Sequence, residues 1–251
     1  MAIRDTYVVT VLLDVNNEQD IDDRAESRTY IIADCASGQA VIVDSVIENV
    51  DRDITIAREL SVTVLFALET HVHADHITGA SLIRDRIGAR IVYGGGAEGV
   101  VTGADLFLHH GQELSFGNTI LKALATPGHT DGCISYVVPG AVFTGDALFI
   151  RGNGRTDLQG GSAATLFDSV RETLFALPDD TVVYPGHDYG GRICSTILEE
   201  KQFNERLNLS VDKATFIAMM ASRKSPRPTK MDLAIPANLL AGRILHIPQG
   251  A

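Results

Sequence analysis

Three imidazoles and a carboxylate crowd the six residues from His71 to His76, directly after the apolar run 63–68. His71 and His73 lie two apart, so in an extended segment they project from the same face. Asp75 and His76 follow where the chain turns. Imidazole and carboxylate are the ligands of zinc and non-haem iron, whereas calcium and magnesium favour oxygen ligands alone. The stretch therefore predicts a transition-metal site at the end of a buried strand, in preference to a solvated loop that begins a helix.

Three later apolar runs end in the same way. They lead to His129, to Asp146 and to His187, and a glycine stands directly before each of these residues. Residues that follow the ends of packed strands gather at one rim of the sheets, where a rigid scaffold positions loop chemistry. Glycine allows the tight turn that points each side chain back to a shared centre. We therefore expect these three residues to join the first cluster.

Hydrophobic periodicity predicts a mixed α/β chain. Ser37-Gly38 indicates a hairpin, Asn49 or Asp51 is a candidate cap for one helix, and Ser162 is a candidate cap for another. The acidic segment 14–26 is predicted to be a surface loop. Strands are predicted at 6–13, 28–33, 40–44, 63–68, 90–93 and 181–184, a β-meander at 105–108, 113–116, 119–125, 134–138 and 141–143, and helices at 51–60, 80–87, 163–177 and around 215–220. No repeat or composition shift divides residues 1–251, which predicts a single domain.

Charge and cysteine usage exclude several function classes. The formal net charge of -11 argues against a nucleic-acid partner, because duplex binding normally needs a basic face. No basic leader and no apolar run long enough for a membrane span is found, so we expect a soluble, cytoplasmic protein without membrane contact. Cys35, Cys133 and Cys194 are widely separated, which predicts reduced thiols, and a buried small hydrophobe is the preferred interpretation of each.

The order His-x-His-x-Asp-His, followed by Gly-His, Gly-Asp and Gly-His, resembles the metallo-β-lactamase superfamily. Its fold is an α/β (α+β) αββα sandwich with the metal site at one edge. Within it the chain is similar to the persulfide dioxygenases related to the human ethylmalonic encephalopathy protein. The resemblance rests on DRD at 51–53, THVHADHITG at 70–79, ATPGHT at 125–130, FTGD at 143–146, GRTD at 154–157, YPGHDY at 184–189 and IPANL at 235–239. It covers about residues 27–242 and leaves 1–26 outside, and Ser45 departs from the family's usual proline.

The resemblance implies a single ferrous ion held by the residues that match His71, His129 and Asp146. Two histidines and one carboxylate form the facial triad of oxygen-using iron enzymes, which leaves coordination positions open. The four other candidates, assigned to a surrounding shell that orients ligands or water, are His73, Asp75, His76 and His187. The implied substrates are glutathione persulfide and O2, and the products are sulfite and glutathione. A homodimer is also implied by the family.

Substrate contacts are predicted on two loops. Arg155, in the glycine-flanked stretch 154–157, is expected to pair with a glutathione carboxylate or to order the residues around the metal. Tyr189 and Arg192, which flank the His187 loop, are further candidates.

Two other functions remain open on the sequence. All seven positions that would hold two metals in a superfamily hydrolase are present, so the ligand inventory alone allows a hydroxyacylglutathione (thioester) hydrolase with two zinc ions or a mixed zinc and iron centre. Counting metals separates the two enzymes. The more distant alternative is a non-enzymatic metal-binding or redox-sensing protein, although a structural zinc site is usually a closed four-ligand shell, often rich in thiolates.

Overall fold

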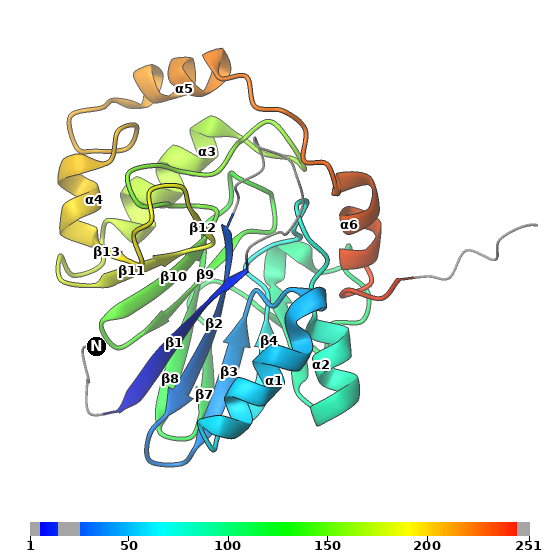
Figure 1. The fold of residues 1–251 in the computed structure, drawn as a ribbon. Coiled ribbons are helices and arrows are strands. Elements are labelled where there is room, and N and C mark those ends of the chain that lie inside the picture. The colour runs from blue at the N-terminus through cyan, green and yellow to red at the C-terminus, as the bar shows by residue number, and fades with distance from the viewer. Residues whose placement is uncertain (1–5, 15–25, 245–251) are drawn as a thin grey trace, which may run out of the picture.

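The protein consists of two β-sheets packed face to face, with helices on the outer face of each sheet (Figure 1). The computed structural model describes residues 6–14 and 26–244. The αββα arrangement predicted from the sequence is therefore confirmed. The N-terminal residues 1–5 and most of the predicted acidic loop at 14–26 lie outside the described residues. Within the described ranges, each helix is too short or too polar to cross a membrane.

The first sheet mixes antiparallel and parallel pairing. The first three strands pair antiparallel and the next three continue in parallel, in the spatial order β1-β2-β3-β4-β5-β6. Parallel neighbours need crossover connections, which the two helices α1 (Val50–Glu59) and α2 (Ala80–Ile87) provide. The strands are β1 (Tyr7–Asp14), β2 (Glu26–Asp34), β3 (Gln39–Val43), β4 (Thr63–Leu68), β5 (Arg90–Gly94) and β6 (Leu106–Leu108), with the short β12 (His187–Asp188) paired to β2.

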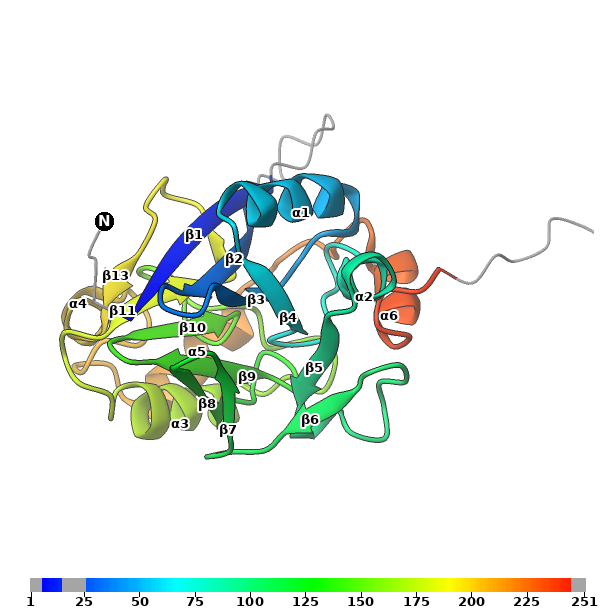
Figure 2. The same cartoon turned by 90° about the horizontal axis from the view of Figure 1, so that it is seen from below.

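The second sheet is a meander extended by two short strands. Strands β7 to β10 pair antiparallel in sequence, β11 joins β10 in parallel, and β13 closes the other edge. Its members are β7 (Glu113–Phe116), β8 (Thr119–Ala125), β9 (Ile134–Val138), β10 (Ala141–Gly145), β11 (Val182–Pro185) and β13 (Ser195–Thr196). The helices of this half are α3 (Ala163–Asp168), α4 (Ile197–Phe203) and α5 (Lys213–Ser222), while α6 (Met231–Asn238) returns to the first half, beside α2 (Figure 2).

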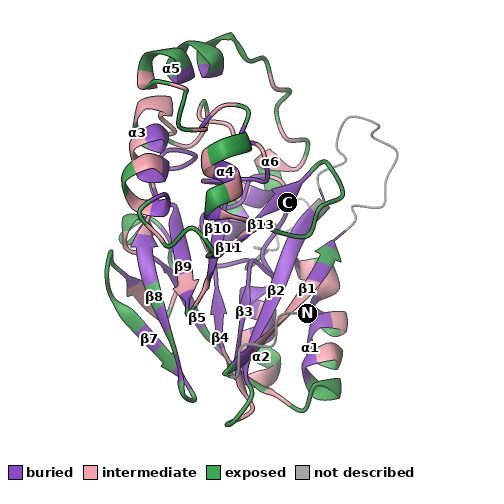
Figure 3. Ribbon diagram, turned by 90° about the vertical axis from the view of Figure 1, so that its left-hand side faces the viewer, coloured by how far each residue is buried: buried purple, intermediate pink, exposed green. Residues whose placement is uncertain are grey.

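Burial follows the layers. One apolar cluster fills the space between the sheets, with Tyr30, Phe116 and Phe143 among its largest members. A second lies between the first sheet and helices α1 and α2, and a third lies between the second sheet and helices α3 and α5 (Figure 3). The loops that connect the strands at one rim therefore rest on a rigid frame.

The structure corrects three local predictions. The strand predicted at 105–108 does not belong to the meander: β6 pairs in parallel with β5, where the Asp105 carboxylate accepts a bond of 2.7 Å from the Ile91 N–H. The helix predicted at 163–177 is α-helical only to Asp168 and continues as a π-helical turn over Ser169–Leu174. Helix α1 begins after Asn49, but this side chain makes no capping bond, because its amide donates to Asp14 at 2.7 Å.

Candidate metal centre

The four strand ends converge at one rim of the sandwich. His71 follows β4, while His129, Asp146 and His187 follow strands of the second sheet. Glycine is required at two of these turns. Gly128 has φ +133°, and a Cβ there would lie 2.3 Å from the backbone N of Leu166. Gly145 has φ +48°, and a Cβ there would lie 2.4 Å from the Thr70 hydroxyl.

Three buried side chains face one another at this rim. One ligand atom each from His71, His129 and Asp146 lies within 4.8 Å of the others. The His129 Nε2 is 3.5 Å from Asp146 Oδ2, and the rings of His71 and His129 meet edge to face with centroids 4.8 Å apart. The structure thus brings together the three residues predicted to hold the metal.

Hydrogen bonds set which nitrogen each of the two rings presents. The His129 Nδ1 lies 2.7 Å from the carbonyl oxygen of Arg155, which only accepts, so Nδ1 carries the proton and Nε2 keeps its lone pair. The Thr70 hydroxyl donates to Asp44 at 2.8 Å and therefore accepts from His71 Nδ1 at 2.9 Å, which frees His71 Nε2 in the same way. Both rings have the tautomer that a metal ligand needs.

The protonation of these groups also suits a cation. Burial, together with the neighbouring rings of His73 and His129, lowers the pKa of His71 well below its ordinary value, so the ring is neutral at pH 7. The Asp146 Oδ1 is buried and makes no hydrogen bond with the described residues. The neutral His71 ring, the His129 ring that presents Nε2, and a carboxylate with an unbonded oxygen are a donor set that fits a divalent transition metal.

A second group surrounds the first. The Asp75 Oδ2 lies 3.1 Å from His76 Nδ1 and 3.6 Å from His187 Nε2, and accepts a bond of 3.0 Å from the Ser27 hydroxyl. Burial raises the pKa of Asp75, but the rings of His76 and His187 outweigh it and hold that pKa well below its ordinary value. The His76 Nε2 is buried without a hydrogen bond to the described residues, which leaves a nitrogen that a second ion would use.

His73 differs from the other histidines in its partners. Its Nε2 lies 3.2 Å from Asp44 Oδ1 and 3.2 Å from Glu69 Oε2, both of which are buried. Burial lowers the pKa of His73, but these carboxylates dominate and hold it well above its ordinary value. The ring therefore belongs to a buried polar network under the centre. The sequence predictions missed Asp44 and Glu69, although each is a charged residue placed directly after an apolar strand.

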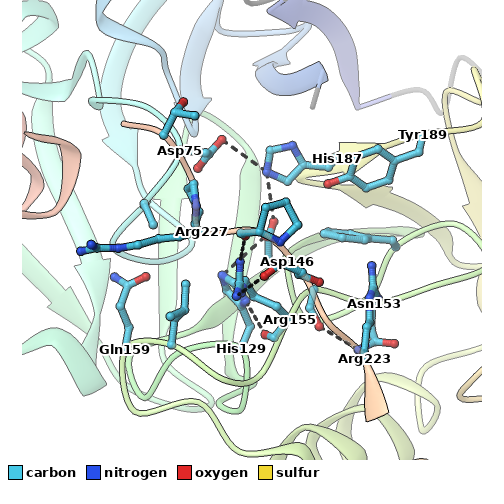
Figure 4. Close-up of a pocket in the computed structure, with 18 residues that line it drawn as sticks. Asp75, His129, Asp146, Asn153, Arg155, Gln159, His187, Tyr189, Arg223 and Arg227 are labelled. Carbon is cyan, nitrogen blue, oxygen red and sulfur yellow. Dashed lines mark hydrogen bonds and ion pairs between the residues drawn. The ribbon is translucent and has the colours of Figure 1, made fainter. Parts of the chain in front are cut away.

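A cavity of about 420 Å³ opens onto the centre (Figure 4). Its inner wall includes Asp75, His129, Asp146 and His187, and its outer wall includes Phe149, Arg155, Gln159 and Tyr189. The roof is the linker between α5 and α6, which contributes Arg223, Ser225, Pro226, Arg227, Pro228 and Thr229. Arg223 and Arg227 were not predicted, because a Pro-rich linker carries no periodic signal.

The predicted substrate residues have different outcomes. Arg155 and Tyr189 line the cavity, whereas Arg192 is exposed and is absent from the described residues that line it. The Arg155 guanidinium bonds to both carboxylate oxygens of Asp157, at 2.7 and 2.8 Å, and to the Pro226 carbonyl at 2.6 Å. Its direct contact with a glutathione carboxylate stays a prediction, but the side chain clearly ties the roof to the loop that holds His129.

The cysteines take no part in the centre. Cys35, Cys133 and Cys194 are all free thiols, and none is among the described residues that line the cavity. Cys133 is buried as predicted, whereas Cys35 and Cys194 are exposed, so the prediction of a buried residue is wrong for these two. Burial raises the pKa of Cys133 to about 12, so this thiol is protonated at pH 7.

Comparisons with known proteins agree with this geometry. Residues 23–187 match the family model of the metallo-beta-lactamase superfamily. The human persulfide dioxygenase ETHE1, mitochondrial, is 43% identical over 219 residues, which cover 85% of this chain and 84% of the human protein. The crystal structure of ETHE1 from Myxococcus xanthus has a TM-score of 0.87 and 43% identity, and the match covers 94% of this chain and 100% of that chain.

A thioester hydrolase matches a shorter part of the chain. The hydroxyacylglutathione hydrolase of Brucella ovis is 40% identical over 152 residues, which cover 60% of this chain and 54% of that protein. The similarity to the dioxygenases covers more of both chains than the similarity to this hydrolase does.

Proposed function

This chain belongs to the metallo-β-lactamase superfamily and, within it, to the persulfide dioxygenases, and on this premise we propose that it oxidises glutathione persulfide at a single ferrous ion. The ion would be held by His71, His129 and Asp146. The overall reaction balances as GSSH + O2 + H2O giving GSH, sulfite and two protons. The terminal sulfur is oxidised, O2 is reduced, and the sulfur–sulfur bond breaks.

The observation that carries the proposal is the orientation of the two rings. His71 and His129 each donate through Nδ1 to an oxygen and so offer Nε2 to the centre, where Asp146 supplies the carboxylate. Ferrous iron held by His71, His129 and Asp146 would supply the redox chemistry toward O2. One side of the group opens to the cavity, which gives the persulfide access.

The chain's own residues bind and orient the substrate. A persulfide of glutathione is anionic and must approach a protein of net charge -11. Arg155, Arg223 and Arg227 line the walls and roof of the cavity, and their donors can attract such a substrate, although Arg155 and Arg227 also pair with Asp157 and Asp232. Phe149 and Tyr189 form an aromatic wall beside His187, with the ring centroids of Phe149 and Tyr189 6.2 Å apart.

The hydrolase remains the nearer alternative for a specific reason. One ligand atom each from His73, Asp75 and His76 lies within 4.8 Å of the others, and His76 Nε2 is unbonded to the described residues. The His187 Nε2 lies 3.6 Å from Asp75 Oδ2, beside this second group. Against it, His73 directs its Nε2 to Asp44 and Glu69, and the Asp75 carboxylate is engaged by Ser27 and His76. The redox-sensing alternative is disfavoured, because the thiols lie away from the centre.

Metal analysis on protein purified without oxygen tests the proposal. We expect about one iron per chain, together with O2 consumption and sulfite formation when glutathione persulfide is added. Two zinc ions per chain, with thioester cleavage and no O2 uptake after iron loading, would instead establish the hydrolase. The cytoplasmic location and the homodimer stay predictions.

A further inference from the structure

The segment His73–Thr78 is buried without regular secondary structure, although it carries three of the candidate metal-site groups. His73, His76 and Thr78 are each no more than 2% exposed. Buried backbone N–H and C=O groups in such a segment need partners, and the isolated bridge between Val46 and Thr78, with the bond of 2.9 Å from the Ile47 N–H to the Ile77 carbonyl, supplies only some of them. The partners therefore determine the shape of the segment.

One side chain satisfies three of these backbone groups. The Asn238 amide donates to the carbonyl oxygens of His73 at 2.9 Å and His76 at 2.8 Å, while its oxygen accepts from the Thr78 N–H at 2.9 Å. Asn238 is completely buried. The amide orientation follows from these contacts, because the reverse placement would set its oxygen against two carbonyl oxygens.

Helix α6, which carries Asn238, is itself fixed to the first half of the molecule. Its Ala234 and Ala237 pack on Ile77 of the segment. Just past the helix, the carbonyl of Leu239 accepts from the Thr102 N–H at 2.7 Å. Two further bonds join Ser81 of α2 to the carbonyl of Ala241, the shorter of them at 2.6 Å. The helix is a rigid support that lies beside α2 (Figures 1 and 2).

We propose that Asn238 is a positioning residue of the metal centre. By clamping both ends of the His73–Thr78 segment, it holds Asp75 and His76 at the centre and keeps the His73 ring on Asp44 and Glu69 beneath it. This inference rests on the proposed function in one respect, since it requires the centre to bind a metal ion. It assigns a task to the C-terminal helix, which supplies none of the candidate ligands.

The substitution Asn238→Asp tests the clamp. Aspartate has nearly the same shape and keeps the acceptor for the Thr78 N–H, but it replaces both amide donors with an oxygen that faces two carbonyls. The matched control is Asn204→Asp. Asn204 is also completely buried, donates to Gly152 O at 3.0 Å and to Glu200 Oε2 at 2.9 Å, and accepts from the backbone N–H groups of Arg206 and Leu207.

Metal affinity and a spectroscopic signature are the readouts. The apo forms of both variants and the wild type are titrated anaerobically with Fe(II) against a chelator, and with Co(II), whose visible bands report the ligand geometry. We expect both substitutions to lower the melting temperature. Only Asn238→Asp should weaken Fe(II) binding, by about tenfold or more, and shift the Co(II) bands, because orienting partners of metal sites have effects of this size.

Two results would overturn the inference. In the first, Asn238→Asp keeps the Fe(II) affinity and the Co(II) bands of the wild type. In the second, Asn204→Asp loses as much Fe(II) affinity as Asn238→Asp, which would indicate general destabilisation. If Asn238→Asp does not fold, Asn238→Ser and Asn204→Ser are compared in the same titrations. A wild-type protein that holds two zinc ions would refute the dioxygenase proposal without affecting this comparison. The Asn238 and Asn204 variants can be titrated in the same way with whichever ion the centre holds.

Discussion

Replacing Arg155 with lysine keeps the positive charge at the cavity but removes the planar guanidinium, and we expect kcat/KM for glutathione persulfide to fall about tenfold. The side chain joins two parts of the site. Its guanidinium bonds to Asp157 and to the roof carbonyls of Pro226 and Ser225, while its backbone carbonyl holds the His129 ring. Lysine preserves the backbone part and the charge, but it cannot make all the guanidinium bonds at once.

The magnitude follows from the exposure of each partner. Asp157 is 58% exposed, so solvent screens its pair with Arg155, and we assign at most about 1 kcal/mol to it. The guanidinium nevertheless bonds to both carboxylate oxygens, and these hydrogen bonds lower the pKa of Asp157. The charged bond to the Pro226 carbonyl contributes about 1.5 kcal/mol more. Lysine recovers part of this sum, and a net loss near 1.4 kcal/mol corresponds to about tenfold.

Steady-state O2 uptake and iron content are measured together for Arg155→Lys. We expect the loss to appear mainly as a higher KM, because the roof loosens, with iron content near that of the wild type. The matched control is Arg171→Lys, since the Arg171 guanidinium also donates to backbone carbonyls, those of Leu207 and Asn208, at a distance from the cavity wall. Unchanged kinetics would refute the reasoning, as would an equal loss in the control. Loss of iron would reassign Arg155 to support of the metal.

Two further predictions concern the centre and the stability of the fold. His129→Ala should abolish both metal binding and O2 uptake. His73→Ala should retain most of the metal, because the His73 Nε2 is directed to Asp44 and Glu69. Equal losses of metal in the two variants would contradict the three-ligand assignment. Burial raises the pKa of Asp53 to about 6 although Arg52 opposes it, so the folded form binds this proton more tightly than the unfolded chain and loses stability as the pH rises toward 6. Asparagine at this position mimics the protonated acid. In denaturant titrations, the free energy of unfolding of Asp53→Asn relative to that of the wild type should therefore increase by about 2 kcal/mol between about pH 4.5 and 7.5. A difference that does not depend on pH would contradict the assignment.

The sequence could predict which side chains gather at the rim because their signal is local. His71, His129, Asp146 and His187 each follow an apolar run, and the strands that deliver them are long enough to be recognised. Helix α4 was missed although Thr196 and Glu199 form a capping box, which is a readable signal. Helix α6 was harder to predict, because it contains Pro236 and has an apolar pattern that is not amphipathic.

What the sequence did not predict depends on contacts between distant segments. The three residues of β6 fit either sheet, and the bond between Asp105 and Ile91 decides the choice. Asp44, Glu69 and Asn238 are polar residues whose burial becomes apparent only when β3, β4 and α6 meet under the centre. The guanidinium of Arg155 could not be placed either, since its partners lie up to 71 residues away.

The division of the candidate ligands between the two sheets has a thermodynamic consequence. His71 belongs to the first sheet, whereas His129 and Asp146 belong to the second, so an ion bound by all three acts as a cross-link between the halves of the molecule. Neither half alone offers more than two of these donors. Release of the ion and separation of the sheets are therefore coupled, and each increment of binding free energy adds to the free energy of unfolding. The holoprotein should therefore open as one cooperative unit.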